Sequence, residues 1–132
     1  MADTMQFDLV SPEKSLASAQ VTEVQIPGAE GDLTAMPNHA PLITTLRPGV
    51  LKAAGPDGDM EYVVTGGFAE ISAEGTSVLA ERAYAVADMT ADVLSTLLDE
   101  GKAALEGAPA DAKDALAQQV ADLEAMGAKV GL

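Results

Sequence analysis

Glycine and proline are distributed unevenly along this chain of 132 residues, and their positions constrain its fold more than any other feature. Eight of the 12 glycines and six of the seven prolines lie in residues 1–87. Proline fixes φ and removes a backbone donor, while glycine adopts positive φ at no steric cost. The first two-thirds of the chain is therefore expected to form short elements separated by frequent turns.

Short apolar runs lie between these turns. Residues 21–26 alternate apolar and polar side chains, which is the pattern of a half-buried strand. Further strands are predicted over residues 5–10, 42–46, 50–54, 60–65, 68–72 and 76–81. Such a series predicts a β-sandwich or a barrel, with Gly66-Gly67 forming a bulge or a tight turn.

Residues 88–132 have a different character, because only Pro109 remains and alanine becomes frequent. Either Asp88 or Thr90 is suited to cap a helix, and Gly107-Ala108-Pro109 breaks it before a second helix, whose first turn suits the proline. Apolar and small residues recur at intervals of 4, 3 and 4 in each segment: Leu94, Leu98, Gly101 and Leu105, then Leu116, Val120, Leu123 and Gly127.

This periodicity predicts an antiparallel hairpin of two helices, whose small residues let the helices approach closely. The hairpin has few large apolar residues, so we expect it to be marginal alone and held by packing on the β domain or on a partner. Two domains are therefore predicted, residues 1–87 and 88–132, with the boundary near residues 85–88.

The net charge of −14 excludes several kinds of partner. Residues 1–87 carry 4 basic and 12 acidic residues, and residues 88–132 carry 3 and 9, which gives −8 and −6. Both parts repel a phosphate backbone or an anionic lipid surface, so nucleic-acid binding and lipid docking are not expected. The charge favours solubility, and the alternative interpretation is a basic protein partner.

The absence of cysteine rules out disulfides, thiol catalysis and cysteine-based zinc sites, and no metal site or cofactor is predicted. The first six residues contain neither a basic nor an apolar region typical of a signal peptide, and no Arg- and Ser-rich transit segment is apparent. No apolar run approaches the roughly 18–20 residues of a membrane span, so direct membrane insertion is not expected.

Catalysis is not expected from this chain. His39 is the only histidine, and its neighbours along the chain offer no nucleophile. Its ring is expected to pack into, or hydrogen-bond across, the loop between Pro37 and Pro41. The run Asp57-x-Asp59-x-Glu61 is similar to the start of a calcium loop but lacks the later ligands, so an acidic hairpin tip is predicted. No P-loop motif occurs.

Six short motifs follow one another in a characteristic order. They occupy residues 7–13, 27–31, 37–42 (Pro-Asn-His-Ala-Pro-Leu), 46–49, 66–70 and 78–81. Together they resemble the epsilon subunit of a bacterial F-type ATP synthase over residues 7–82, whereas the last third is similar only in its helical, alanine-rich character. The resemblance implies an α+β fold: an N-terminal β-sandwich of about ten strands followed by a C-terminal antiparallel two-helix hairpin.

The resemblance also implies a function. The family's epsilon subunit is a non-catalytic part of the central rotor, on the cytoplasmic face of the inner membrane, which docks on the gamma subunit and the c ring. It thereby helps to couple proton flow to ATP synthesis. By the family's pattern, c-ring contact falls on Glu30, Asp32, Asn38 and His39. The gamma contact is expected on an apolar sheet face that the sequence does not define.

The hairpin is where regulation is expected, because in many bacterial relatives it extends along the stalk and blocks ATP hydrolysis at the catalytic alpha and beta subunits. Those relatives carry basic residues there, which face an acidic lever on the catalytic subunits, whereas residues 88–132 sum to −6. Like charges brought together cost free energy, so weak or no inhibition is predicted. The alternative is the same subunit with a strongly inhibitory hairpin.

A nucleotide motif of some bacterial epsilon subunits, Ile/Leu-Asp-x-x-Arg-Ala, is similar to residues 98–103. Asp99 falls on its aspartate and Lys102 on its arginine. Lysine does not reproduce the planar fork of arginine, so at most a weak nucleotide site is implied. An ordinary solvated Asp–Lys pair is the favoured interpretation.

Two other classes of protein agree less well with this sequence. A small carbohydrate- or peptide-binding β-sandwich usually displays exposed aromatic residues or a basic groove, and this chain has four aromatic residues and a pI near 4.1. A small hydrolase needs a nucleophile paired with a base, and none is apparent.

Overall fold

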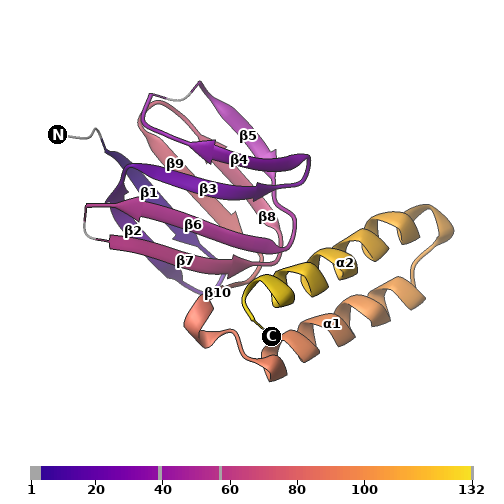
Figure 1. The fold of residues 1–132 in the computed structure, drawn as a ribbon. Coiled ribbons are helices and arrows are strands. Elements are labelled where there is room, and N and C mark those ends of the chain that lie inside the picture. Colours follow the sequence, from indigo (N-terminus) through magenta and orange to yellow (C-terminus); the bar gives the residue numbers. More distant parts are fainter. Residues whose placement is uncertain (1–3, 39, 57, 132) are drawn as a thin grey trace.

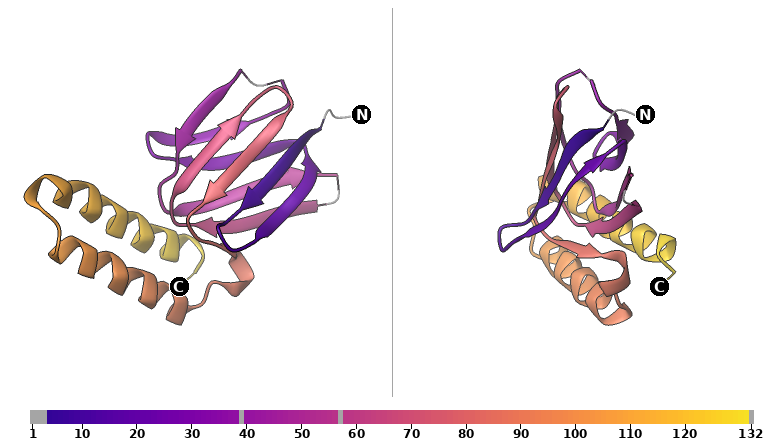
Figure 2. Two further views of the ribbon diagram at one scale, coloured as in Figure 1. Left: turned by 180° about the vertical axis from the view of Figure 1, so that it is seen from behind. Right: turned by 90° about the vertical axis from the view of Figure 1, so that its left-hand side faces the viewer.

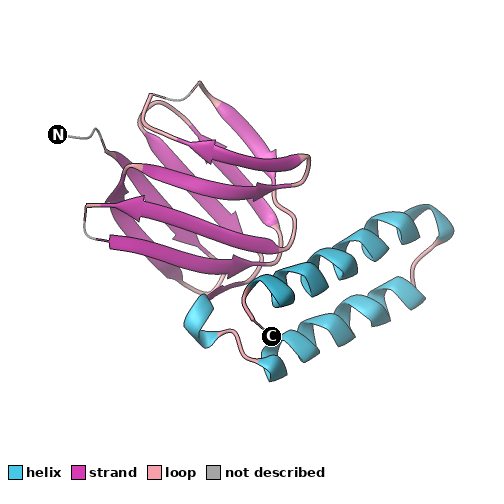
Figure 3. Ribbon diagram, in the orientation of Figure 1, coloured by secondary structure: helices cyan, strands magenta, loops and turns pink. Residues whose placement is uncertain are grey.

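A computed structural model describes residues 4–38, 40–56 and 58–131, which form two five-stranded sheets followed by two helices (Figures 1 and 3). Sheet I has the order β2 (Ser15–Val21), β1 (Met5–Val10), β9 (Gly75–Ala80), β8 (Gly67–Ile71) and β5 (Leu42–Thr45). Sheet II has the order β10 (Ala83–Ala85), β7 (Gly58–Val64), β6 (Gly49–Gly55), β3 (Glu23–Gly28) and β4 (Gly31–Ala35). The predicted sandwich of about ten strands is confirmed.

The inner faces of the two sheets enclose the main hydrophobic core. In β1 the side chains alternate between buried and half-buried, with Phe7 and Leu9 fully buried. Leu51 from β6 and Ile71 from β8 lie in the same cluster. Because side chains alternate across a strand, the other half of each strand faces outward and determines what each sheet presents to a partner.

Three strands were not predicted from the sequence. β2 is rich in serine and alanine, β4 is short and begins Gly-Asp, and β10 has three residues. The expectation of one strand over residues 21–26 was also wrong in detail, because β2 ends at Val21 and β3 begins at Glu23. Small and polar residues give a weak strand signal, and here their pairing partners define the strands.

The helical part has the order η1 (Val86–Asp88), α1 (Ala91–Glu106), η2 (Ala110–Ala112) and α2 (Lys113–Lys129). Thr90 is the N-cap of α1, and its Oγ1 accepts a hydrogen bond of 3.3 Å from the backbone N–H of Val93. Of the two predicted caps, the structure therefore uses Thr90, whereas Asp88 lies in η1. Pro109 immediately precedes η2, which leads into α2.

The two helices approach closely at two glycines, as predicted. A Cβ atom at Gly101 would lie 3.1 Å from Cγ2 of Val120, and one at Gly127 would overlap the side chain of Leu94. Both glycines lie where the opposite helix presents a branched apolar side chain. This close approach buries apolar surface between the helices, which larger residues at the two positions would hold further apart.

The hairpin packs on the outer face of sheet II, at one end (Figure 1). Tyr84, Val63 and Val50 are paired across β10, β7 and β6, and this row packs against the buried Leu123 and Met126 of α2. Seen from behind, sheet I has no helix across its outer face (Figure 2). The described helices therefore cover the two sheets unequally.

Candidate interaction site

The β3–β4 turn carries the first two candidate carboxylates. Ala29 and Glu30 form its tip, between the paired residues Gly28 and Gly31. Gly31 has φ +141°, and a Cβ atom at Gly28 would lie 2.7 Å from the carbonyl oxygen of Gly31. The turn therefore requires glycine at both positions. Among the described residues, Glu30 makes no ion pair, and its side chain is exposed.

This turn is fastened to the connection between β5 and β6. The N–H of Ala29 donates to the carbonyl of Thr45 at 2.9 Å, and the N–H of Arg47 donates to the carbonyl of Pro27 at 3.0 Å. An isolated bridge pairs Gly28 with Leu46. Backbone bonds on two sides fix the direction in which the tip projects, although β4 is an edge strand.

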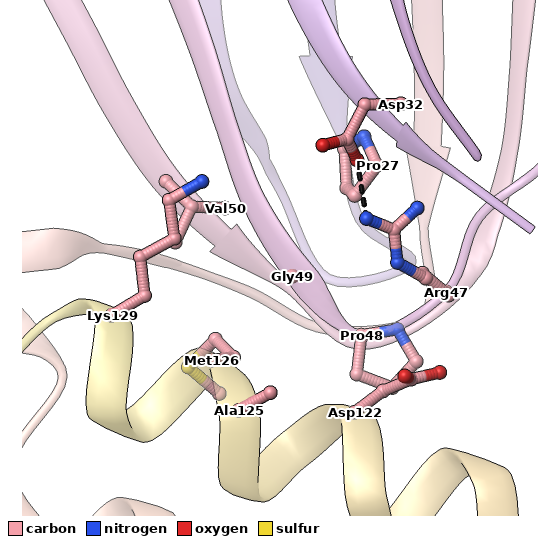
Figure 4. Close-up of a pocket in the computed structure, with 10 residues that line it drawn as sticks. All are labelled: Pro27, Asp32, Arg47, Pro48, Gly49, Val50, Asp122, Ala125, Met126 and Lys129. Atoms are coloured by element: carbon pink, nitrogen blue, oxygen red, sulfur yellow. Dashed lines mark hydrogen bonds and ion pairs between the residues drawn. The ribbon is translucent and has the colours of Figure 1, made fainter.

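Arg47 adds a side-chain clamp to the same turn. Its guanidinium donates to the carbonyl of Gly28. It also forms an ion pair with the carboxylate of Asp32 (Figure 4). Asp32 lies in β4 with 71% of its side chain exposed, while Arg47 is 31% exposed. The predicted carboxylate at Asp32 is therefore held in place by a residue that the sequence analysis did not single out.

Arg47 also borders a cleft of about 100 Å³ between sheet II and α2 (Figure 4). Pro48 and Gly49 form one wall, and the side chains of Asp122 and Lys129 project from α2 on the other. Two acidic and two basic groups therefore meet where the hairpin approaches the β5–β6 connection. The cleft lies beside the β3–β4 turn and links it spatially to the hairpin.

Asn38 lies beyond the far end of β4. It has φ +67°, a conformation that asparagine tolerates, and its N–H donates to the carbonyl of Ala73 at 3.2 Å. The five residues of β4, about 17 Å of extended chain, lie between Glu30 and Asn38. The structure therefore places the two predicted contact regions at opposite ends of one edge strand and does not bring them together. His39, the fourth predicted residue, lies outside the described residues.

The outer face of sheet I carries exposed apolar residues, which we call the sheet I stripe: Ile43, Phe68 and Leu79. Their exposed fractions are 68%, 40% and 45%. Phe68 is paired directly with Leu79, and on its other side with Thr45, two residues from Ile43. Contiguous exposed apolar side chains on a small acidic domain mark an interaction surface.

Asp99 and Lys102 are exposed on α1. Within the part of the chain that the structure describes, neither forms an ion pair or a side-chain hydrogen bond. Their neighbour Glu100 instead pairs with Arg82 of the sandwich. The weak nucleotide site at these two residues stays a prediction.

Two further properties bear on the site. In residues 4–38, 40–56 and 58–131, no helix combines the length and hydropathy that crossing a membrane requires. The same residues contain no group of three or more acidic side chains, histidines or cysteines placed to hold a metal ion. The candidates that the structure describes at the surface are the β3–β4 turn, Asn38 and the sheet I stripe.

Comparison with known proteins first gives the class of the sandwich. The sequence model of the family described as "ATP synthase, Delta/Epsilon chain, beta-sandwich domain" matches residues 4–86. That range includes all ten described strands, from the start of β1 at Met5 to the end of β10 at Ala85. The sandwich is therefore an ATP synthase delta/epsilon domain.

Full-length relatives extend the match through the hairpin. An ATP synthase epsilon chain of Ruegeria sp. (strain TM1040) is 57% identical over 138 residues, and one of Rhodobacter capsulatus is 54% identical over 132 residues; each alignment covers 100% of both chains. That of Paracoccus denitrificans (strain Pd 1222) is 48% identical over 139 residues, which cover 100% of this chain and 94% of the relative. The chain belongs to the ATP synthase epsilon chain family, as its motifs indicated.

Solved structures share the fold at low sequence identity. A chain of the Euglena gracilis mitochondrial ATP synthase, in a structure of OSCP, F1 and c-ring, has a TM-score of 0.73 at 19% identity and is aligned over 96% of this chain and 81% of its own. A chain of the Tetrahymena thermophila mitochondrial enzyme, from its central stalk and c-ring, has a TM-score of 0.57 at 18% identity, over 68% and 72%. These likenesses show that the sandwich recurs in distant sequences.

Two elements of the candidate site were missed at the level of sequence. Arg47 lies in the predicted motif Leu46-Arg47-Pro48-Gly49, but its ion pair with Asp32 spans 15 residues and depends on tertiary structure. The sheet I stripe was also missed, although the alternation within residues 68–72 and 76–81 already separates Phe68 and Leu79 from their buried neighbours. That alternation is the signal that could have found the stripe.

Proposed function

We propose that this chain is a non-catalytic rotor subunit of a proton-translocating F-type ATP synthase. It is peripheral, on the cytoplasmic face of a bacterial inner membrane, and docks on the gamma subunit and the c ring. Family membership supports the assignment to the complex. The observation that carries the docking proposal is the unequal coverage of the sandwich: the hairpin packs on sheet II, while sheet I exposes the sheet I stripe.

The gamma subunit is assigned to the outer face of sheet I. Phe68 and Leu79 provide a paired apolar centre, and the neighbouring row of the same face carries Glu70 and Asp8. An interface with an apolar centre and an acidic rim fits a partner with apolar side chains flanked by basic ones. The polar outer row of sheet II, which includes Lys52 and Glu61, lacks such an apolar centre.

The c ring is assigned to the edge formed by β4 and its flanking loops. Glu30 projects from a turn fixed by glycines and by the β5–β6 connection, and Asn38 follows the other end of the strand. His39, the next residue in the sequence, is included in the proposal from the family's pattern. Stiff polar turns suit an interface that transmits torque, because little ordering entropy is lost on contact. Proton-driven rotation of the ring would pass through these contacts to the stalk, while ATP synthesis takes place in other subunits.

The hairpin is assigned weak or no inhibition of ATP hydrolysis. Its largest buried apolar residues, including Leu123 and Met126, are already used against sheet II. Extending toward the alpha and beta subunits would expose that cluster and would present a segment with a net charge of −6. A strongly inhibitory hairpin is the alternative, and it would require partner contacts that offset this loss.

The gamma assignment is tested with the double variant Phe68→Gln/Leu79→Gln. Both side chains are exposed, so folding should be retained, and binding to purified gamma subunit should weaken by at least tenfold, which is about 1.4 kcal/mol. Lys52→Gln, on the outer face of sheet II, is the control and should bind as the unmodified chain does. Unchanged affinity of the double variant would remove the stripe from the gamma interface.

A further inference from the structure

Arg47 occupies an unusual place for one of only seven basic residues in the chain. It lies between β5 and β6, yet its guanidinium reaches the β3–β4 turn at two points, the carbonyl of Gly28 and the carboxylate of Asp32. Its backbone N–H bonds the same hairpin at Pro27. One residue therefore holds the strand before the turn and the strand after it.

The turn depends on this support because of its position in sheet II. β4 is an edge strand, so the ladder with β3 supports it from one side only. A guanidinium has a planar fork of donors that can bond a carbonyl and a carboxylate together, whereas a lysine ammonium acts as a point charge. Arg47 is about two-thirds buried beside the α2 cleft, so its contacts are partly shielded from water.

The charges around Arg47 are arranged to keep it on the turn. Asp32 lies on the turn side, while Asp122 and Lys129 line the cleft on the α2 side. Among the described residues, Asp32 is the one carboxylate that forms an ion pair with Arg47. The ion pair with Asp32 is then the dominant electrostatic contact of Arg47.

We propose that Arg47 is the positioning residue for the c-ring contact: it fixes the direction of the Glu30 tip and the orientation of the Asp32 carboxylate. This inference rests on the proposed function, in which this turn meets the c ring. The group that the turn recognises is then a basic side chain or an amide donor on a polar loop of the ring, because the turn presents carboxylates.

The proposal distinguishes positioning from general stabilisation. Arg47 lies at one end of the sandwich, outside the main hydrophobic core. Replacing it should loosen the turn and leave the core intact, so local exchange and global stability should respond differently. The variants are full-length chains with Arg47→Gln, Arg47→Lys or Asp32→Asn, and Lys52→Gln is the charge-matched control.

Two measurements test it. Hydrogen exchange of the free subunit reports the turn itself, for which the amide of Ala29 is the most direct probe because it bonds Thr45. Binding of the subunit, in complex with gamma, to purified c ring reports the proposed contact. Arg47→Gln should increase the rate of hydrogen exchange in the turn by about tenfold and weaken c-ring binding by about tenfold. Effects of this size are expected when a charge-assisted hydrogen bond is lost.

The other variants make the result specific. Arg47→Lys should restore c-ring binding only in part, because one ammonium does not reproduce the two-point contact. Asp32→Asn keeps the size of the side chain but removes the ion pair, so exchange in the turn should rise here too. Lys52→Gln should change neither measurement.

The two proposals fail in different ways. If Arg47→Gln leaves exchange in the turn unchanged, the positioning role is overturned, while Glu30→Lys still tests the c-ring contact. If exchange rises but c-ring binding does not fall, Arg47 has a structural role only and the inference is again overturned. If Glu30→Lys also binds normally in that case, the assignment of this turn to the c ring fails as well.

Discussion

Arg82, in the connection between β9 and β10, forms an ion pair with Glu100 on α1, with 2.7 Å between Nη1 and Oε2. The pair adds a polar link between the sandwich and α1. The hydrogen bond and charge of Glu100 raise the pKa of Arg82. Because 47% and 51% of the two side chains are exposed, water and salt screen the attraction.

We predict a small contribution from this pair to stability. Arg82→Gln and Glu100→Gln should each lower the free energy of unfolding by less than about 1 kcal/mol, with a coupling of about 0.5 kcal/mol in a double-mutant cycle. Urea unfolding at low and high salt measures both, and the coupling should shrink at high salt. Since the pKa of Arg82 is raised, this contribution should persist through neutral pH and be lost as the pH rises into the strongly alkaline range. A salt-independent coupling would contradict this account.

The helix seam gives a graded prediction. Gly127→Ala should destabilise the hairpin by about 1–2 kcal/mol, because the new methyl group displaces Leu94 from its position. Gly101→Ala should be nearly neutral, since a gain of about 1 kcal/mol in helix propensity offsets crowding by Val120. Gly107 is the matched control, because a Cβ atom there meets nothing closer than 3.7 Å. Hydrogen exchange of α1 and α2 measures the series, and equal protection in all three variants would refute it.

Hydrogen exchange also tests the prediction that the hairpin is only marginally stable. Its helices meet the sandwich mainly through one apolar cluster that includes Leu97 and Met126. Amides of residues 91–129 in the free subunit should therefore exchange faster than those of β1 and β9 in the sandwich core. Protection of the hairpin equal to that of the core strands would show that it does not open independently.

Glu30→Lys should leave the fold intact, because its side chain is exposed at a turn, and should weaken co-purification of the rotor with the c ring. The reason is that a carboxylate is replaced by the opposite charge at the proposed contact. Glu124→Lys, at an exposed position of α2, makes the same change of charge on the hairpin and serves as control. If both variants lost co-purification with the c ring equally, the cause would be the change in net charge and not a contact made by the turn.

ATP hydrolysis by the assembled synthase should be nearly the same with the full subunit and with one ending at Asp88. The prediction follows from the charge of −6 on residues 88–132, which disfavours binding to an acidic site on the catalytic subunits. Assembly must be verified for the shortened chain, since it uncovers Val63 on sheet II. A clear rise in hydrolysis would mean that the hairpin inhibits through apolar contacts or through gamma.

Much of this fold could be predicted from periodicity and turn chemistry. The strands containing Phe7, Leu51 and Ile71 alternate clearly, and Gly101 and Gly127 marked the helix seam. β4 could not be predicted, because Gly31–Ala35 has too few apolar residues to indicate a strand, and its pairing with β3 defines it. Such a strand is set by its neighbours and not by its own composition.

The candidate site was less predictable than the fold for a related reason. Glu30 and Asp32 were found because they lie in a recognisable turn, but the partner of Asp32 comes from a segment 15 residues away. Long-range ion pairs depend on how sheets and connections are placed, which local sequence patterns do not encode. The sheet I stripe differs, because alternation along β8 and β9 marks Phe68 and Leu79 as outward-facing, and only their pairing with β5 depends on tertiary structure.

The parallel pairing of β1 with β9 also bears on how the chain is made. Gln6 lies opposite Gly75, so the first strand reaches one of its two neighbours only after some seventy residues have been synthesised. Until then the hairpin with β2 is its only support, and the apolar side chains of Phe7 and Leu9 have no finished core to enter. Such distant contacts slow folding. On the ribosome, completion of sheet I must therefore wait for β9, and a chain halted before that point would present an unfinished, aggregation-prone sheet to cellular quality control.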